Sequence, residues 1–590
     1  MMKRKLTLIS LVVAAALLFG ACTGETTVPT TSSTGSTTKG TTAATTGTTT
    51  ATAETTKELE TIYLDLMMFS LKGFDDKINT ALESPVFDEI EKQTGVRLSF
   101  TGLTGDQTDV IMASRSTTDL LTVVSVDQCN RLIEADMVIP LDDLIQTMAP
   151  NVRDLYPERL ESSRSELSNG TGKIYFLPSN AGTNAVPIRE DISLYTLRWD
   201  YYAAMGYPSV SSPEDMLAVL VDMQALYPEN PDGQKTYGIS GTFATLAHRF
   251  YYTHGYEIAD NSNQQAWINI KDIELNMMYG TEDSIFWDAI KYVYKANQLG
   301  IMDPEYLTQT EEDYTNKVKT GRVLSPDIRW LGITEFNSQA ELEYPDEGIG
   351  FATIPVEAKV WNPGESVAGW GPTFSLSIAS TCKDPERAMM LIDYLYGYEG
   401  SRLINTGVQG RDWEYKDGKP VLTNFGLTKW LTGGDSWEIK TLFTYLSNFC
   451  GIKAGTISPD GGQVNLYQDA AIYSRTMLSV DKAMSSYYGV SFPFEKIVEL
   501  VEAGKAVRAD NWDSRIQTAT GSAGEDIARI DVKMASIAET YLPQIILAKS
   551  DAEFDALKAA MISEMKANGY DTSVADWMAR FNAAKAKYGK

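Results

Sequence analysis

Apolar and polar positions alternate along the folded part of the chain in a pattern that predicts strands followed by helices. Residues 60–69 place an apolar side chain at nearly every second position, which predicts a strand. The apolar stripe in residues 85–94 predicts a helix, with Pro85 in its first turn and Gly95 as its stop signal. Residues 96–100 are again rich in β-forming side chains, so the chain returns directly to a second strand.

The same alternation continues and predicts the fold class. Residues 120–126 form a third short β-rich run between two helical patterns. Longer helices are predicted for residues 213–226, for residues 283–299 and from a capping box at Ser550 and Glu553 onward. Strands that alternate with helices favour a mainly parallel sheet with both faces covered, and hence an α/β fold.

The first sixty residues predict export and a membrane tether. A basic start precedes an apolar run over residues 6–19, too short to cross a bilayer, so residues 1–21 predict a secretory signal peptide. The small residues before Cys22 resemble a bacterial lipobox, which predicts acylation of Cys22; the alternative is an ordinary signal peptide in which Cys22 plays no part. Of the 34 residues from 23 to 56, 18 are Thr, so residues 22–57 predict a lipidated Cys followed by a disordered linker.

The composition argues against nucleic acid as a partner. The chain has 51 Lys and Arg residues against 78 Asp and Glu, a formal net charge of −27, and no basic run outside the signal peptide. Nucleic-acid binding needs clustered cations. With 30 Tyr, 19 Phe and 11 Trp the chain can fill a large core and still offer rings to a ligand. Cys129, Cys382 and Cys450 lie far apart and predict buried thiols, with no disulfide framework.

Common catalytic motifs are absent from the sequence. His248 and His254 are its two histidines, and their spacing does not fit a zinc-protease pair. The sequence also has no CxxC unit, no GxSxG motif and no phosphate-binding glycine loop with a Lys. We therefore expect no enzyme, no cofactor and no metal. The alternative is a surface glycoside hydrolase, which needs only two carboxylates placed across a sugar.

Three segments carry a resemblance to a known family. The first is residues 87–145, where FDEIEKQTGVRLSF and TTDLLTVV surround Asp119. The second combines GKIYFLPSNAG at residues 172–182 with residues 197–241, and the third is residues 369–415, which end in a GxxGxxW turn. In this order they resemble the extracellular solute-binding proteins of ABC importers, specifically the large, lipid-anchored, oligosaccharide-type members related to maltose-binding protein.

The resemblance implies a two-lobed, periplasmic-binding-protein-like fold of type II. Each lobe would be a mainly parallel sheet flanked by helices, and the C-terminal region would be helical. Lobe 1 is expected to comprise residues 58–182 plus 352–400, and lobe 2 residues 183–351 plus 401–590 with the C-terminal helices. Some relatives carry a calcium loop at the position of residues 230–237. Here the oxygen ligands at alternating positions are missing, so no metal is expected.

The resemblance also implies a function. The protein would capture a carbohydrate, an oligosaccharide, between its lobes and deliver it to the ABC permease subunits. Its lipid would hold it at the extracellular face of the cytoplasmic membrane, as expected for a Gram-positive bacterium, and it would act as a monomer. One alternative keeps the fold but binds a peptide or another solute, or acts as a sensor co-receptor.

Candidate ligand contacts follow from the chemistry of sugars. Sugar sites combine flat aromatic faces with planar donors and acceptors. The resemblance places Trp330, with Arg329 beside it, and Trp370 in loops between the lobes. For each aromatic residue the alternative is burial in the core, and the two aspartates below could instead cap helices or pair with Arg. The further candidates are Trp199, Asp200, Tyr201, Asn180, Tyr251, Trp413 and Asp119.

Overall fold

The chain divides into residues 1–57 and residues 58–590. The predicted signal peptide, Cys22 and the linker fall in the first part and lie outside the described residues. Within the part of the chain that the structure describes, no helix is both long and apolar enough to cross a membrane. The computed structural model describes residues 59–103, 105–182, 193–259, 264–326, 329–357, 360–361, 370–432, 437–509 and 512–590.

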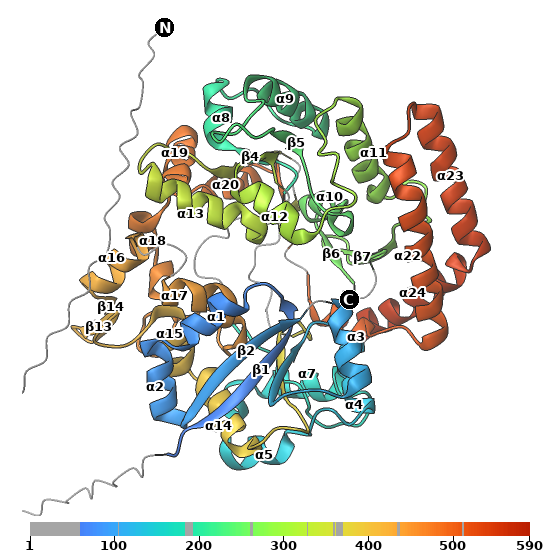
Figure 1. Cartoon of the computed structure of the whole chain (residues 1–590). Coiled ribbons are helices and arrows are strands. Elements are labelled where there is room, and N and C mark those ends of the chain that lie inside the picture. Colours follow the sequence, from blue (N-terminus) through green and yellow to red (C-terminus); the bar gives the residue numbers. More distant parts are fainter. Residues whose placement is uncertain are drawn as a thin grey trace, which may run out of the picture. The chain divides into compact units, whose positions relative to one another are not determined.

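A four-stranded sheet forms the centre of the first lobe (Figure 1). Its strand order is β12 (Ser375–Ile378), β3 (Leu120–Val123), β1 (Ile62–Leu71), β2 (Val96–Leu103). Strand β1 runs parallel to both of its neighbours, whereas β12 runs antiparallel to β3. The predicted strands at residues 60–69 and 96–100 are confirmed. Of the predicted run 120–126, residues 120–123 form a strand, and a helix begins at Val126. The parallel arrangement of these three strands is confirmed.

Helices cover both faces of this sheet because β1 sends apolar side chains to both sides. Leu66 and Met68 join the core with α1 (Asp75–Leu82), α2 (Pro85–Thr94) and α14 (Pro385–Tyr396). Met67 and Phe69 point to the other face and pack with α3 (Gly105–Ser114) and α4 (Val126–Glu134). The predicted stop of α2 is confirmed, since Gly95 has a left-handed φ of 64°. The lobe also contains α5 (Asp142–Met148), α6 (Pro150–Leu155) and α7 (Pro157–Glu166).

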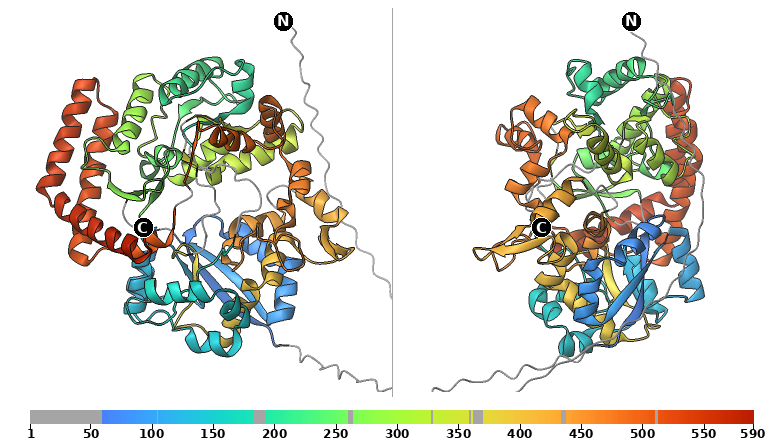
Figure 2. Two further views of the ribbon diagram at one scale, coloured as in Figure 1. Left: turned by 180° about the vertical axis from the view of Figure 1, so that it is seen from behind. Right: turned by 60° about the vertical axis from the view of Figure 1, so that its left-hand side comes forward.

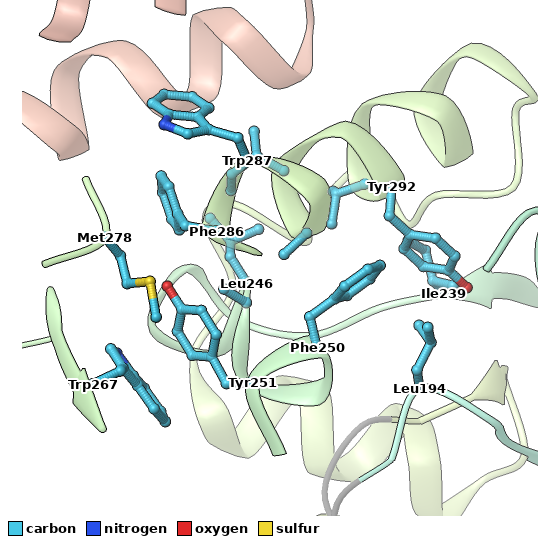
Figure 3. Close-up of a cluster of buried hydrophobic side chains, with 14 of the residues drawn as sticks. Leu194, Ile239, Leu246, Phe250, Tyr251, Trp267, Met278, Phe286, Trp287 and Tyr292 are labelled. Atoms are coloured by element: carbon cyan, nitrogen blue, oxygen red, sulfur yellow. The ribbon is translucent and has the colours of Figure 1, made fainter. Parts of the chain in front are cut away.

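The second lobe distributes its strands over small sheets around one large core. Strands β5 (Tyr237–Ile239) and β9 (Val323–Ser325) pair in parallel, and β4 (Thr196–Arg198) pairs antiparallel with β10 (Phe351–Thr353). Strands β6 (Tyr256–Ile258), β7 (Ala266–Asn269) and β8 (Glu274–Met277) form an antiparallel sheet. Figure 3 shows part of the core, where Phe250, Tyr251, Trp267 and Phe286 lie together. The helices of this lobe include α8 (Trp199–Ala204), α9 (Pro213–Leu226), α10 (His248–Thr253), α11 (Ile285–Gln298), α12 (Glu311–Lys319), α13 (Thr334–Glu343), α19 (Ser479–Tyr488) and α21 (Arg515–Thr520).

Three long helices complete the second lobe and confirm the predicted helical C-terminal region. They are α22 (Glu525–Ile546), α23 (Asp551–Ala567) and α24 (Tyr570–Lys587), and α22 and α23 run side by side at the edge of the lobe (Figures 1 and 2). Ser550 caps α23 as predicted, because its side chain accepts the backbone N–H of Glu553 at 3.2 Å.

Two segments differ from the predicted lobe boundaries. Residues 352–356, predicted for the first lobe, contribute Ala352, Ile354 and Val356 to the core of the second. Residues 401–467, predicted for the second lobe, contribute to the core of the first. Leu403 and Ile404 of α15 (Tyr398–Thr406), and Ile439 of α17 (Glu438–Thr441), lie in the core of the first sheet and not in that of the second lobe. These segments have apolar faces that the first sheet covers, and sequence periodicity does not say which sheet an apolar face will meet. By core membership the first lobe contains described residues from 59–182 and 375–467, and the second from 193–356 and 480–590. Further elements are β11 (Val360–Trp361), β13 (Trp413–Lys416), β14 (Lys419–Leu422), β15 (Val507–Arg508), α16 (Asn424–Thr432), α18 (Ala470–Thr476) and α20 (Glu495–Glu502).

Candidate ligand-binding site

The carboxyl end of the first sheet is the natural place for a ligand, because open α/β sheets bind ligands beyond the carboxyl ends of their parallel strands. The turn after β1 occupies this edge, with Leu71 at φ 61° and Gly73 at φ 92°. After β3, Ser125 caps α4 by accepting the backbone N–H of Gln128 at 3.2 Å. Because β12 is antiparallel, its amino end lies at the same edge, and Trp370 precedes that end by five residues.

Trp370 is packed between residues of both lobes. The Cζ atom of Arg159, from α7, lies 4.9 Å from the ring centroid, and that of Arg515, from α21, lies 5.2 Å away. The residue is 7 % exposed. Burial lowers the pKa of Arg159, whereas hydrogen bonds to Asp513 raise the pKa of Arg515. The ring therefore binds two guanidinium groups of the protein itself.

Asn180 lies where the chain leaves the first lobe, next to the segment 183–192 that leads to the second. Its backbone has a φ of 58°, in the left-handed region. Its Nδ2 donates to Oδ1 of Asn448 at 2.7 Å, and its backbone N–H donates to the carbonyl of Cys450 at 2.9 Å. Asn448 was not predicted as a site residue, because 268 positions separate it from Asn180 and nothing in its local sequence marks it.

Asp119 occupies the amino end of β3 and not the carboxyl edge. Its carboxylate accepts the backbone N–H groups of Asp65 and Lys383, each at 2.9 Å. The Lys383 ammonium lies 3.3 Å from the same carboxylate. Asp119 therefore has a structural position, but its partner is a Lys and not the Arg named in the alternative, and the structure does not bring it toward the other candidates.

Two loops of the second lobe follow the paired parallel strands β5 and β9. The loop Ser240–Thr245 follows β5, and within it Phe243 is half-buried while Ala244 is exposed. Strand β9 leads within a few residues to the helical segment η2 (Arg329–Ile333), which begins with Arg329 and Trp330. The side chains of Arg329 and Trp330 lie outside the described residues. Their backbone nevertheless follows the carboxyl end of β9, the edge at which a ligand is expected.

Trp199, Asp200 and Tyr201 make contacts within the second lobe. Trp199 is 1 % exposed and packs among tyrosines. Asp200 forms two hydrogen bonds with Arg198, at 2.9 and 2.6 Å. The Tyr201 ring stacks on Tyr227 with 3.7 Å between centroids and also lies under the Arg198 guanidinium. These contacts match the alternatives of core burial and pairing with Arg.

Tyr251 and Trp413 are also buried. Tyr251 lies 4.1 Å from Trp267 between ring centroids inside the core of Figure 3, and burial raises its pKa well above the ordinary value. Trp413 is 7 % exposed, donates its indole N–H to the carbonyl of Gly407 at 2.9 Å and lies beside Arg402. In this structure neither ring offers a free face to a sugar.

In residues 230–237, at the position where the resemblance implies a calcium loop in some relatives, the Asn230 side chain forms hydrogen bonds that hold the backbone of the segment together. Asn230 accepts the backbone N–H of Gln234 at 2.8 Å and donates to the carbonyl of Thr320 at 2.7 Å. Among the described residues, no group of three or more His, Cys, Asp or Glu side chains is arranged to hold a metal ion.

A polar cavity of about 510 Å³ opens beside α12. Its wall includes the buried Lys317, whose ammonium donates to Asp303 and Gln309 at 2.7 Å each. The lining side chains are polar or charged, so the cavity lacks the apolar face that a sugar ring stacks against. They are Gln234, Glu305, Thr308, Gln309, Asp313, Asn316, Lys317, Thr320 and Arg322.

Comparison with known proteins identifies the fold and not a family. No protein-family model matches the chain, and no curated protein matches its sequence. Solved structures do match over almost their whole length. An EF-hand mutant of the ABC-transporter substrate-binding protein FusA of S. pneumoniae, in complex with fructo-nystose, matches with a TM-score of 0.57 at 16 % identity. The match covers 89 % of this chain and 100 % of that structure.

Two further structures extend the comparison. The alginate-binding protein AlgQ2 has a TM-score of 0.55 at 15 % identity, covering 89 % of this chain and 98 % of its own. An ABC-transporter-associated solute-binding protein of Bifidobacterium longum infantis, described as HMO-binding, has a TM-score of 0.52 at 13 % identity. The match covers 88 % of this chain and 99 % of that structure. At these identities the likeness establishes the fold, and the predicted two-lobed solute-binding-protein fold is confirmed.

Proposed function

We propose that this protein is the extracellular substrate-binding component of an ABC importer, which captures an oligosaccharide and delivers it to the membrane permease. One observation carries the proposal: the chain matches substrate-binding proteins over 98 to 100 % of their length. One of these neighbours is an alginate-binding protein and the other is in complex with fructo-nystose, and both ligands are carbohydrates. The proposal does not include catalysis.

The anchoring of the protein is a separate part of the proposal. Cys22 follows small residues and an apolar run, as in bacterial lipoproteins, and the Thr-rich residues after it would act as a spacer. Two acyl chains on Cys22 would hold the protein at the outer face of the cytoplasmic membrane, because each buried methylene contributes about 0.8 kcal/mol. The protein would work there as a monomer beside its permease.

For the ligand contacts we propose Trp330 and Arg329 first, since their backbone follows the carboxyl end of β9. Asn180 and Asn448 would supply planar amide groups from the first lobe, where they already pair. Trp370 is a weaker candidate for a ligand contact, because the guanidinium groups of Arg159 and Arg515 already lie against its ring. Contacts from both lobes would favour a closed state, so the ligand would shift the population toward closure.

A thermal-shift panel tests this function. The purified chain is heated with fructo-, manno- and alginate oligosaccharides and, in parallel, with a peptide mixture. A ligand at 100 times its dissociation constant adds about 2.7 kcal/mol of stability. With an unfolding entropy of about 2.1 cal/mol/K per residue, that raises the melting temperature of a unit of this size by about 2–3 °C.

Variants and a product assay complete the test. We expect Trp330→Ala to weaken glycan binding by about 1–3 kcal/mol without changing the unligated melting temperature. Tyr344→Ala, at a ring that is 45 % exposed on α13's C-terminal side, is the matched control and should bind as the wild type does. Stabilisation by peptides alone would contradict the sugar proposal, and new reducing ends would indicate a hydrolase.

A further inference from the structure

A network of polar side chains adjoins the loop Ser240–Thr245 of the second lobe, with a buried centre and the exposed Glu305 at its margin. Its centre is Lys317, whose side chain is 6 % exposed, and its partner Asp303, which is fully buried. The Lys317 ammonium donates to Asp303 at 2.7 Å, to Gln309 at 2.7 Å and to Glu305. An ammonium has three protons, so the network uses every donor that Lys317 has.

The network is joined directly to the loop. The Ser240 hydroxyl donates to Asp303 at 2.7 Å, and Gln309 donates its Nε2 to that hydroxyl oxygen at 2.9 Å and also to the carbonyl of Gly241. A Cβ on Gly241 would come within 2.7 Å of the Tyr306 ring, so the backbone approaches that ring closely. The first two loop residues are therefore fixed by side chains from residues 303–317.

The end of the loop is fixed by its own hydrogen bonds. The backbone N–H of Thr242 donates to Oγ1 of Thr245 at 3.0 Å, and the backbone N–H of Thr245 donates to the carbonyl of Thr242 at 3.0 Å. Both threonines are buried, while Phe243 between them is half-buried against the core. The loop thus holds a partly exposed aromatic ring just beyond the carboxyl end of β5.

We propose that Lys317, acting through Asp303 and Gln309, is a positioning residue that fixes the loop Ser240–Thr245 and so presents Phe243 to a carbohydrate ligand. The inference rests on the proposed function and adds a ring to its site. An isolated buried charge is costly, and here the cost is offset by pairing and full hydrogen bonding. Fixing the loop before binding lowers the ordering entropy that a ligand must offset.

Hydrogen exchange tests the positioning role without any ligand. In Lys317→Met we expect the amides of residues 240–245 to exchange at least tenfold faster than in the wild type, while β1 is unchanged. Lys319→Met is the matched control, because Lys319 lies on the same helix, is 35 % exposed and pairs with Glu335 at 3.5 Å. If Lys317→Met fails to fold, Gln309→Ala keeps the Lys317–Asp303 pair and should still speed exchange in the loop. Unchanged exchange in the loop would overturn the positioning role.

Glycan titration tests the ring. With an oligosaccharide that stabilises the wild type, we expect Phe243→Ala to weaken affinity about tenfold while leaving the exchange of the loop amides below a twofold change. Phe425→Ala, at a ring 45 % exposed in the first lobe, is the control and should bind normally. Unchanged affinity in Phe243→Ala would overturn the role of this ring. If no glycan binds the wild type, the proposed function fails, and the exchange experiment still decides whether Lys317 fixes the loop.

Discussion

Replacing Trp370 with Ala distinguishes a structural ring from a ligand-binding one. The side chain is 7 % exposed and lies about 5 Å from two guanidinium groups, from Arg159 and Arg515. Truncating a buried Trp to Ala costs about 3–5 kcal/mol, and each cation–π contact adds about 0.5–2 kcal/mol where it is desolvated. We therefore expect Trp370→Ala to lower the free energy of unfolding by about 4 kcal/mol or more.

The expected shift in melting temperature follows from the size of the unit. Residues 58–590 unfold with an entropy of about 1.1 kcal/mol/K, at about 2.1 cal/mol/K per residue. A loss of about 4 kcal/mol then lowers the melting temperature by about 3–4 °C, and by about twice that if each lobe unfolds separately. Differential scanning calorimetry measures this shift, and Trp370→Phe, which keeps an aromatic face, should lose less.

One result would refute this account. If Trp370→Ala melts with the wild type and binds a stabilising glycan at least tenfold more weakly, the ring faces the ligand and the contacts with Arg159 and Arg515 contribute little to folding. If the variant is destabilised but keeps its affinity when assayed well below its melting temperature, the ring is structural. Tyr344→Ala, a truncation at an exposed ring, shows how much any loss of an aromatic side chain changes the melting temperature.

Three further predictions concern charge and thiols. Hydrogen bonds from Arg402 hold the pKa of Asp460 well below its usual range, so the carboxylate stabilises the fold above about pH 4 and this contribution is lost as the pH falls further. Urea unfolding between pH 7 and pH 3 should therefore show a smaller loss of stability on acidification for Asp460→Asn than for the wild type. Asp119→Ala leaves two backbone N–H groups without their acceptor, so urea unfolding should show a loss of about 2–3 kcal/mol in the free energy of unfolding. Asp119→Asn should be less stable than the wild type and more stable than Asp119→Ala. Burial raises the pKa of Cys382 to about 11 and of Cys450 to about 12, so both thiols are protonated at pH 8. In a chain that starts after Cys22, they should react slowly with a disulfide reagent at pH 8 until urea unfolds the protein. Fast reaction in the native state would contradict this.

The local elements of the fold could be predicted from the sequence because their signals are local. Gly95 ends α2, Ser550 caps α23, and the first half of β1 alternates with Leu64 and Leu66 on one face. The two-lobed fold was predicted from the order of three segments that resemble a known family, and no single motif among them specifies that fold. The membership of residues 401–467 in the first lobe could not be predicted, because an apolar helical face is the same whichever sheet it covers.

The candidate site was predicted less completely, and the reason is the abundance of aromatic residues. A Trp in a core and a Trp against a sugar carry the same local sequence, and only tertiary contacts separate them. Trp199 and Tyr251 are buried in the core of the second lobe. The backbone of Trp330, in contrast, lies just beyond the carboxyl end of β9, where a ligand is expected. Asn448 and Asn180 are 268 positions apart, and the chain passes through the second lobe between them. Neither local sequence therefore predicts that the two side chains form a hydrogen bond.

Lys317 and Lys319 lie two positions apart in the sequence NKVKT, yet they differ in burial. The Lys317 side chain is 6 % exposed, whereas that of Lys319 is 35 % exposed. Lys317 is buried because Asp303 lies beneath it and because Ser240 and Gln309 complete the hydrogen bonds that a buried pair requires. Replacing a buried ion pair by apolar residues of similar volume is often neutral or stabilising, so stability alone does not account for a pair at this place. The role that we propose for Lys317 is to position the loop beyond the carboxyl end of β5.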